Sequence, residues 1–279
     1  MYYRLFRWFP KSAFSRLMGR LAEVHWPGWL LRPVLRAYVA AFRVDMREAA
    51  APLAAYPTFN AFFTRALVPG ARPIAEAPDA LVCPVDGTAG QSGTIAAGRL
   101  LQAKGIDYAL ADLLGGDAGW QAYEGGHFLN LYLSPRDYHR IHSPAAGHVV
   151  RWAYVPGELW TVSRAGVEGV PGLFARNERL VTFIAAVFGE LALVAVGATV
   201  VGRIKVVYHD VTSNRRGARA RGASLATPYP VEKGGEVGRF ELGSSVILLV
   251  RPGEATLTPP PPGTPVRLGQ PIGRMVRAT

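Results

Sequence analysis

Apolar residues near the start of the chain recur at the spacing of an α-helix. One series follows the i, i+3, i+4, i+7 positions and consists of Phe14, Leu17, Met18 and Leu21. This series predicts an amphipathic helix. After a turn at 26–28, we expect a second amphipathic helix over 30–42 and a short helix over 58–65. The pattern therefore predicts an N-terminal helical segment, residues 1–65.

Farther along, short runs of Val, Ile and Leu alternate with Gly and Pro. Such runs predict a mostly β domain over 66–279, with one helical interruption at 101–115. The longest apolar run, 180–202, contains one charge and is long enough to span a membrane. Its content of Val, Thr and Gly, with Gly189 and Glu190 at its middle, instead favours two buried strands joined by a tight turn.

These elements together predict an α+β fold in which amphipathic helices precede a mostly β domain. The turn and strand at 268–273 resemble the closing segment of barrel-sandwich folds, so we expect barrel-sandwich-like character in the β domain. A biotinyl or lipoyl carrier is not indicated, because none of the four lysines lies in the sequence context of a modified carrier lysine.

The composition is that of a globular protein whose cysteine content does not require an oxidising compartment. Hydrophobic residues make up 49% of the 279 residues and charged residues 18%, which excludes a disordered or fibrous chain. The single cysteine, Cys83, excludes an intramolecular disulfide and a cysteine-based zinc site, and we expect it to be a small buried hydrophobe. No signal-peptide pattern is evident, so the expected location is the cytoplasmic side.

Positive charge is concentrated at the N-terminus. Residues 1–44 contain eight Lys and Arg residues against Glu23 alone, which gives +7 of the net charge of +11. The same stretch holds half of the six tryptophans: Trp8, Trp26 and Trp29. Cationic helices with aromatic anchors are typical of segments in a bilayer interface, so we expect peripheral binding to an anionic membrane surface. The alternative is a core-packed helix with a solvated Arg face. Nucleic acid is not an expected partner, because the Arg residues alternate with Trp and Leu at helical spacing.

Two histidines lie in a dense polar segment, 130–144, which also contains an Asp, two Tyr and two Arg residues. His139 and His142 are three residues apart, and around a turn their imidazoles could converge on a proton-transfer site. We expect no metal, since no third ligand lies nearby in the sequence. In the alternative interpretation, each histidine is satisfied by a turn carbonyl.

Two further positions offer candidate chemistry. Asp86 precedes Gly87 at the start of a predicted strand, although Asp-Gly is by itself a common turn dipeptide. Gly243-Ser244 lies directly before an apolar strand, which places a hydroxyl at the mouth of a buried sheet. It is not a nucleophile elbow, because the Gly-x-Ser-x-Gly pattern is missing. A serine hydroxyl next to a glycine carbonyl suits an N→O acyl shift.

Several long motifs, which follow one another in the order typical of one protein family, give the sequence a specific resemblance to that family. They are the segments 84–87, 133–142, 174–179, 196–202 and 242–245. Together they resemble the bacterial phosphatidylserine decarboxylases of the pyruvoyl-dependent type, in their proenzyme form, over nearly the whole chain. The sequence departs from the family's usual Gly-Ser-Thr at the processing site, where it has Gly243-Ser244-Ser245.

The resemblance implies that the chain cleaves itself. Ser244 would attack the carbonyl of Gly243, leaving a β chain, 1–243, and an α chain, 244–279, with Ser244 converted to a pyruvoyl group. That cofactor would form a Schiff base with phosphatidylserine and release CO₂ to give phosphatidylethanolamine. The two chains would form a heterodimer that is expected to dimerise further, on the cytoplasmic face of the cell membrane.

The resemblance also implies roles for individual residues. Asp86, His142 and Ser244 would form a protease-like triad for self-cleavage, in which general-base help is worth about 10²–10⁴-fold. His139 would reprotonate the product or position the substrate carboxylate. Two alternative functions stay open. The first is a serine hydrolase that uses Asp86, His142 and Ser244 without cleaving its own chain. The second is a lipid-binding protein without catalytic activity.

Overall fold

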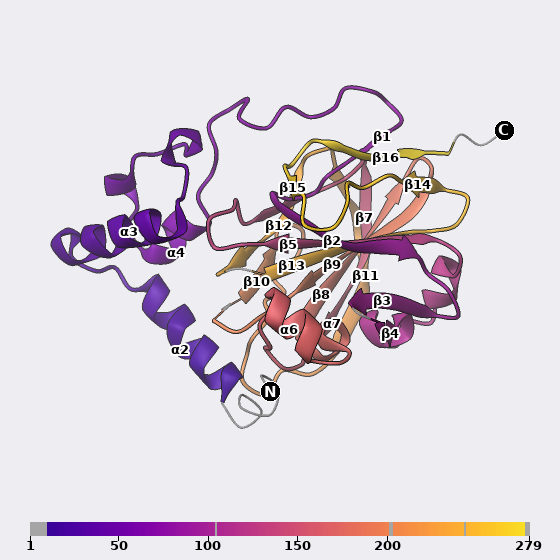
Figure 1. Ribbon diagram of the computed structural model, residues 1–279, viewed down its shortest axis with the longest axis horizontal. Coiled ribbons are helices and arrows are strands. Elements are labelled where there is room, and N and C mark those ends of the chain that lie inside the picture. Colours follow the sequence, from indigo (N-terminus) through magenta and orange to yellow (C-terminus); the bar gives the residue numbers. More distant parts are fainter. Residues whose placement is uncertain (1–9, 104, 201–202, 243, 277–279) are drawn as a thin grey trace.

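The computed structural model describes residues 10–103, 105–200, 203–242 and 244–276. Trp8 and Gly243, both singled out in the sequence, lie outside these described residues. Figure 1 shows the N-terminal helices grouped on one side of the molecule, beside the sheets formed by the rest of the chain. Among the described residues, no helix is long and apolar enough to cross a membrane.

The predicted N-terminal helices are present. They are α2 (Lys11–Glu23), α3 (Gly28–Phe42) and α4 (Phe59–Phe63), with two short 3₁₀ turns between α3 and α4, η1 (Met46–Glu48) and η2 (Leu53–Ala55). Pro27 precedes α3, and Arg43 ends it in the left-handed conformation. Thr58 caps α4 by accepting a hydrogen bond at Oγ1 from the backbone N–H of Ala61 at 3.0 Å.

An open antiparallel sheet of eight strands forms the centre of the β domain, in the order β11-β7-β8-β9-β13-β5-β2-β15. Its strands are β2 (Gly87–Thr94), β5 (His127–Leu133), β7 (Gly147–Val155), β8 (Arg179–Ala186), β9 (Gly189–Val196), β11 (Arg221–Val231), β13 (Ser244–Val250) and β15 (Pro265–Val266). Strand β13 is buried throughout and pairs with β9 on one side and β5 on the other. The α+β class is confirmed.

Smaller elements cover this sheet. Two three-stranded sheets, β10-β12-β6 and β1-β16-β14, and the β3–β4 hairpin accompany short helices. The strands are β1 (Ala80–Val82), β3 (Arg99–Ala103), β4 (Ile106–Ala109), β6 (Arg140–His142), β10 (Arg203–Val206), β12 (Glu236–Glu241), β14 (Ala255–Leu257) and β16 (Pro271–Met275). The helices are α5 (Leu110–Leu113), η3 (Trp120–Tyr123), α6 (Arg164–Gly169) and α7 (Leu173–Arg176).

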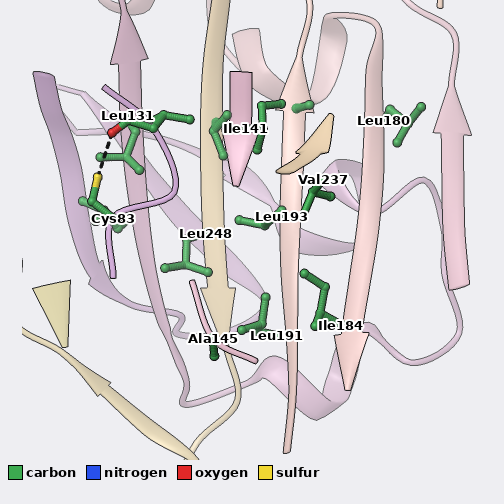
Figure 2. Close-up of a cluster of buried hydrophobic side chains, with 14 of the residues drawn as sticks. Cys83, Leu131, Ile141, Ala145, Leu180, Ile184, Leu191, Leu193, Val237 and Leu248 are labelled. Carbon is green, nitrogen blue, oxygen red and sulfur yellow. Dashed lines mark hydrogen bonds between the residues drawn. The ribbon is translucent and has the colours of Figure 1, made fainter. Parts of the chain in front are cut away.

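The core has two layers, one on each face of the large sheet. Val246 and Leu248 of β13 belong to one cluster, together with Ile141 of β6, whereas Ile247 and Leu249 belong to the other. This division follows from the alternation of side chains along a strand. Figure 2 shows part of the first cluster, with Cys83 at its margin as a buried thiol that donates to the carbonyl of Val85. The expected role of Cys83 as a small buried residue is confirmed.

Two local predictions can be compared with the structure. The run 180–202 does contain two paired strands, β8 and β9, but the turn lies at Val187 and Phe188, just before the expected Gly189. The prediction of a helix over 101–115 is largely wrong. Most of that stretch forms the β3–β4 hairpin, and only α5 is helical. Gly105, with φ of +77°, lets the chain reverse there.

Candidate active site

Ser244 begins the central strand of the large sheet. It is 1% exposed, and its Oγ donates a hydrogen bond to the carbonyl of Val196 at the end of β9. Ser244 shares its side of β13 with Val246 and therefore with the core layer that includes β6. Ser245 lies on the opposite side, and its buried Oγ has no hydrogen-bond partner among the described residues. The alternation of the strand thus separates the two adjacent hydroxyls.

The residue two positions before Ser244 has a strained backbone. Leu242 has a φ of +81°, in the left-handed region that a leucine rarely adopts, and its side chain is buried against Phe63 and Ala22. A non-glycine residue held in such a conformation costs on the order of 1–3 kcal/mol. This strain therefore lies immediately before Gly243, the residue that falls outside the described part of the chain.

His142, on β6, has hydrogen-bond partners at both ring nitrogens. Nδ1 is 2.8 Å from the carbonyl oxygen of Gly234, and Nε2 is 3.1 Å from the hydroxyl of Tyr138. A carbonyl only accepts, so Nδ1 carries the hydrogen, and Nε2 presents a lone pair to the hydroxyl proton of Tyr138. Burial lowers the pKa of His142, which keeps the ring neutral at neutral pH. The imidazole is therefore ready to accept a proton at Nε2.

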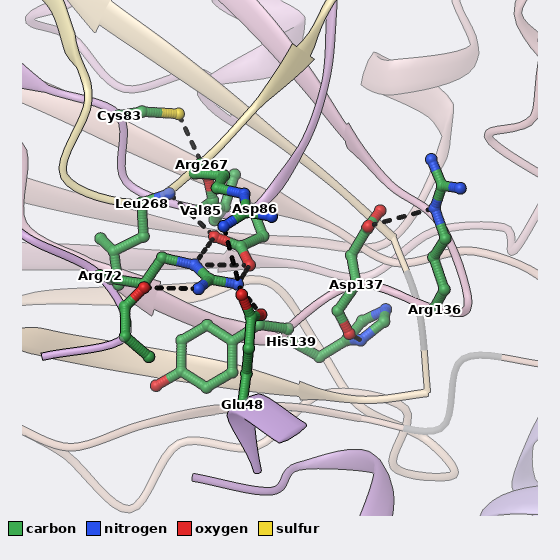
Figure 3. A network of polar contacts seen from close by, with 12 residues as sticks. Glu48, Arg72, Cys83, Val85, Asp86, Arg136, Asp137, His139, Arg267 and Leu268 are labelled. Carbon is green, nitrogen blue, oxygen red and sulfur yellow. Dashed lines mark hydrogen bonds and ion pairs between the residues drawn. The ribbon is translucent and has the colours of Figure 1, made fainter. Parts of the chain in front are cut away.

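The carboxylate of Asp86, in the turn before β2, is surrounded by donors (Figure 3). The Nε of Arg72 lies 2.9 and 3.0 Å from its two oxygens, and Nη2 lies 2.5 Å from Oδ2. The backbone N–H of Leu268 donates to Oδ1 at 2.9 Å. Arg72 also pairs with Glu48 at 2.7 Å. Donors from Arg72 and from Leu268, which are far apart in the sequence, therefore meet at the carboxylate of Asp86.

The turn that carries Asp86 packs closely against its neighbours. The backbone N–H of His142 donates to the carbonyl of Pro84 at 2.8 Å, which places β6 beside this turn. A Cβ on Gly87 would come within 2.3 Å of the carbonyl oxygen of Tyr132 on β5, so only glycine allows this approach. No hydrogen bond joins Asp86, His142 and Ser244 to one another, since each side chain has the separate partners described above.

His139 is fully buried just before β6. Its Nδ1 lies 2.8 Å from the carbonyl oxygen of Asp137, and its buried Nε2 has no partner within the described part of the chain. The ring centroids of His139 and Phe63 are 4.0 Å apart. Burial, assisted by the charge of Arg65, lowers the pKa of His139 to about 3. Arg65 donates to the same Asp137 carbonyl at 3.4 Å. The ring is therefore neutral, with a free lone pair at Nε2.

An apolar pocket of about 710 Å³ opens beside these residues. Residues of α2, α3 and α4 form most of its lining, and Trp26, Pro135, Thr199, Val200 and Leu242 complete it. Phe63, which contacts His139, is also part of the wall. The pocket therefore connects the helical segment to the position directly before Gly243. Among the described residues, no group of three potential metal ligands gathers anywhere.

Sequence reasoning missed several residues that shape this site. Arg72 lies 14 residues before Asp86, whereas Gly234 lies 92 residues after His142 and contributes only a backbone carbonyl. Tyr138 and Arg65 have no spacing rule that would single them out. Only Tyr138 had a signal, because it lies inside the polar segment at 130–144.

Comparison with known proteins gives a consistent result. The family described as phosphatidylserine decarboxylase matches residues 59–274. A protein named phosphatidylserine decarboxylase proenzyme from Anaeromyxobacter sp. (strain K) is 48% identical over 271 residues, which cover 96% of this chain and 95% of the relative. Proteins of the same name from Myxococcus xanthus (strain DK1622) and Polaromonas naphthalenivorans (strain CJ2) are 46% and 47% identical. These matches cover 91% and 94% of this chain, and 90% and 92% of the respective relatives.

Proposed function

The chain belongs to the phosphatidylserine decarboxylase family and is a decarboxylase of that phospholipid, and we propose that its catalytic group is a pyruvoyl group made from its own Ser244. In this proposal the precursor is cut between Gly243 and Ser244 into a β chain, 1–243, and an α chain, 244–279. Ser244 is the nucleophile, His142 its general base, and Asp86 an anion that supports the charge formed on His142.

Self-cleavage begins when Ser244 Oγ gives its proton to Nε2 of His142 and bonds to the carbonyl carbon of Gly243. The peptide C–N bond breaks, and the amine of Ser244 takes the proton from His142, so that an ester replaces the amide. Loss of the Ser244 α-proton expels the Gly243 carboxylate and leaves dehydroalanine. Its imine tautomer reacts with water and releases ammonia, and the new N-terminus is a pyruvoyl group. No oxidant is required.

The observation that carries this proposal is the position of Ser244 directly after a strained segment. The left-handed conformation of Leu242 raises the energy of the intact chain next to the scissile bond. The hydroxyl of Ser244 lies on the side of β13 that faces the β6 layer, whereas that of Ser245 does not. This difference supports Ser244 as the nucleophile despite the neighbouring serine.

The residues around Ser244 suit a pyruvoyl group and a lipid substrate. The pyruvoyl carbonyl would supply the electron sink that decarboxylation of an amino acid requires. We propose that His139 serves this reaction through Nε2, because its ring is neutral and Nε2 has no hydrogen-bond partner in the described ranges. A substrate carboxylate close to Nε2 would favour its protonation, and the proton could then pass to the product carbon after CO₂ leaves.

The helical segment provides a route for the lipid. Moving each CH₂ of an acyl chain out of the bilayer costs about 0.8 kcal/mol, so the substrate is best met at the membrane surface. The apolar pocket can shelter acyl chains next to Leu242, and Leu17 and Trp29 are exposed nearby on α2 and α3, at 53% and 77%. We propose peripheral binding through this face to anionic lipid on the cytoplasmic face of the cell membrane.

The two chains are expected to stay together after cleavage. Strand β13, at the start of the α chain, lies between β5 and β9 of the β chain. Leu268, also in the α chain, donates to Asp86 in the β chain. Cleavage before Ser244 removes none of these contacts.

Intact-mass measurement of the freshly purified protein tests the proposal. We expect two fragments that meet at residue 244, with the smaller one blocked to Edman sequencing and reactive toward hydrazine. The Ser244→Ala variant should remain full length. A full-length wild-type protein that reacts with a fluorophosphonate probe would instead identify a serine hydrolase, and a full-length protein without carbonyl or probe reactivity would contradict both enzymes.

A further inference from the structure

We propose that an arginine-rich turn before β11 is a second membrane-binding element, which docks on anionic lipid beside α2. Its members are Arg215, Arg216 and Arg219, and we call them the basic turn. The inference rests on the peripheral membrane binding proposed above and adds to it a source of charge outside the helical segment. The partner is the surface of an anionic bilayer, which the turn recognises through charge and not through one particular headgroup.

The charge of this segment has one sign only. Residues 211–231 contain four arginines, the basic turn and Arg221, and neither aspartate nor glutamate. The side chains of the basic turn are exposed, and none of them forms an ion pair or a hydrogen bond with another described residue. Arg221 differs, because its guanidinium lies 5.8 Å from the ring centroid of Trp152. Like charges so close together repel one another, and an anionic surface nearby would relieve that repulsion.

The basic turn is held in a defined place by its backbone. At its base, the N–H of Asn214 donates to Oε1 of the buried Glu178 at 2.6 Å. At its tip, the N–H of Ala218 donates to the carbonyl of Arg215 at 3.1 Å, and Gly217 has a φ of +72°. A glycine with positive φ as the third residue of such a turn is typical of the type II β-turn. The arginines therefore project from an ordered turn.

The basic turn begins beside helix α2. Nη1 of Arg16 donates to Oδ1 of Asn214 at 3.5 Å, and the N–H of Val200 donates to Oγ of the buried Ser15 at 3.0 Å. The next residue along α2 is Leu17, whose side chain is exposed. An exposed apolar group with cations around it suits a bilayer interface, because the apolar group enters the acyl region and the cations remain at the headgroups.

The apolar pocket adjoins the same part of the molecule. Val200 and Leu21 both line the pocket, and Leu21 is also exposed on α2, four residues after Leu17. Phosphatidylserine carries a net negative charge, so cations beside this pocket would attract the substrate as well as the bilayer. Nucleic acid matches this surface less well. A bilayer binds cations and exposed apolar side chains together, whereas a phosphate backbone binds the cations alone.

Flotation with phosphatidylglycerol-containing vesicles tests the proposal on the wild-type protein and on a triple variant, Arg215→Gln with Arg216→Gln and Arg219→Gln. Each basic residue near an anionic surface strengthens binding about fivefold, so the triple variant should lose about 100-fold in affinity at low salt. Its binding should also depend less on the salt concentration and on the phosphatidylglycerol content. On vesicles of phosphatidylcholine alone, the two proteins should not differ.

A matched control removes the same amount of charge from other elements. It is a second triple variant, with substitutions on β3, α6 and β16: Arg99→Gln, Arg164→Gln and Arg274→Gln. These arginines are also exposed, but each of them pairs with a carboxylate. We expect the control to lose less than fivefold in vesicle affinity. An equal loss in both variants would show that binding follows the net charge, and it would overturn the inference.

Unchanged vesicle affinity in the basic-turn variant would also overturn the inference. The same holds if that variant loses binding to a labelled DNA duplex but keeps its binding to vesicles. If Glu at Leu17 and Trp29 abolishes flotation and the basic-turn variant still floats like the wild type, the helical face binds the membrane and this inference alone fails. Flotation does not require cleavage before Ser244, so intact mass decides the proposed catalysis separately.

Discussion

The guanidinium of Arg72 and the carboxylate of Asp86 form a paired contact in which both side chains are only 8% exposed. A carboxylate taken out of water needs such a partner, because an unpaired buried charge is strongly destabilising. The pair joins the segment after the helices to the turn before β2, and the N–H of Leu268 links both to the C-terminal part of the chain.

Arg72→Ala should therefore destabilise the fold by about 3–5 kcal/mol, since Asp86 would lose its charged partner. Urea unfolding of the Ser244→Ala precursor, in which the chain stays whole, measures this change. The stability of Arg72→Lys should lie between that of the unsubstituted precursor and that of Arg72→Ala, because lysine restores the charge without the paired geometry. Arg47→Ala is the matched control: Arg47 pairs with Asp45, but its side chain is 90% exposed, and its loss should change little. A small effect of Arg72→Ala would contradict this account.

Leu242→Gly should slow self-cleavage by about tenfold or more, because glycine adopts a positive φ without strain and the intact precursor becomes more stable. Leu242→Ala is the control, since alanine removes the same side-chain contacts with Phe63 but keeps the strained backbone. Cleavage of the two precursors is timed side by side. Equal rates would show that the strain at Leu242 does not contribute to cleavage.

His139 should make the precursor less stable in mild acid. Its pKa in the folded state is about 3, below the usual value near 6.5, so between these values the unfolded chain binds a proton that the folded chain does not. Stability should therefore fall as the pH drops below 6.5, by about 2 kcal/mol at pH 5, and level off near pH 3. The lowered pKa of His142 acts in the same direction.

Urea unfolding at several pH values isolates the contribution of His139. In the Ser244→Ala background, His139→Gln should lower stability near neutral pH but show a flatter decline between pH 6.5 and pH 5. The slope carries the information, because the loss of packing against Phe63 affects all pH values alike. Parallel curves for the two proteins would refute the buried neutral state of His139.

Membrane binding should depend on the exposed apolar face of α2 and α3. Replacing both Leu17 and Trp29 by Glu should weaken binding to phosphatidylglycerol-containing vesicles at least tenfold, because apolar contacts are lost and negative charge is added. Val187→Glu is the control, since Val187 is 91% exposed but lies on the β8–β9 turn. Flotation reports the bound fraction, and added salt should reduce it for the wild type. Undiminished flotation of the double variant would exclude this face of α2 and α3 as the membrane-binding surface.

The parts of the fold that the sequence predicted are those with strong local periodicity. The helix containing Phe14 and Leu17 and the two strands within 180–202 each repeat one pattern over several turns or residues. The hairpin at 99–109 was missed because its reversal depends on the conformation of Gly105. Short elements of this kind are decided by contacts that a local pattern does not contain.

The site shows a similar division. Motifs mark Asp86, His139, His142 and Ser244 as candidate site residues, but motifs do not specify the partners of these residues. The hydrogen bonds of His142 come from Tyr138, four residues away, and from Gly234, on a distant turn. A backbone carbonyl has no sequence signature, and a contact such as that of Arg72 with Asp86 depends on how the whole chain folds.

The burial of β13 in the middle of the large sheet has a consequence for the lifetime of the enzyme. If the bond before Ser244 is cut as proposed, unfolding would free a short peptide, and its return to the sheet would compete with diffusion and aggregation. Strand β13 is covalently joined to the rest of the sheet only while the newly made precursor folds for the first time. Heat inactivation of the mature form should therefore be irreversible, and a cell must replace damaged copies by fresh translation.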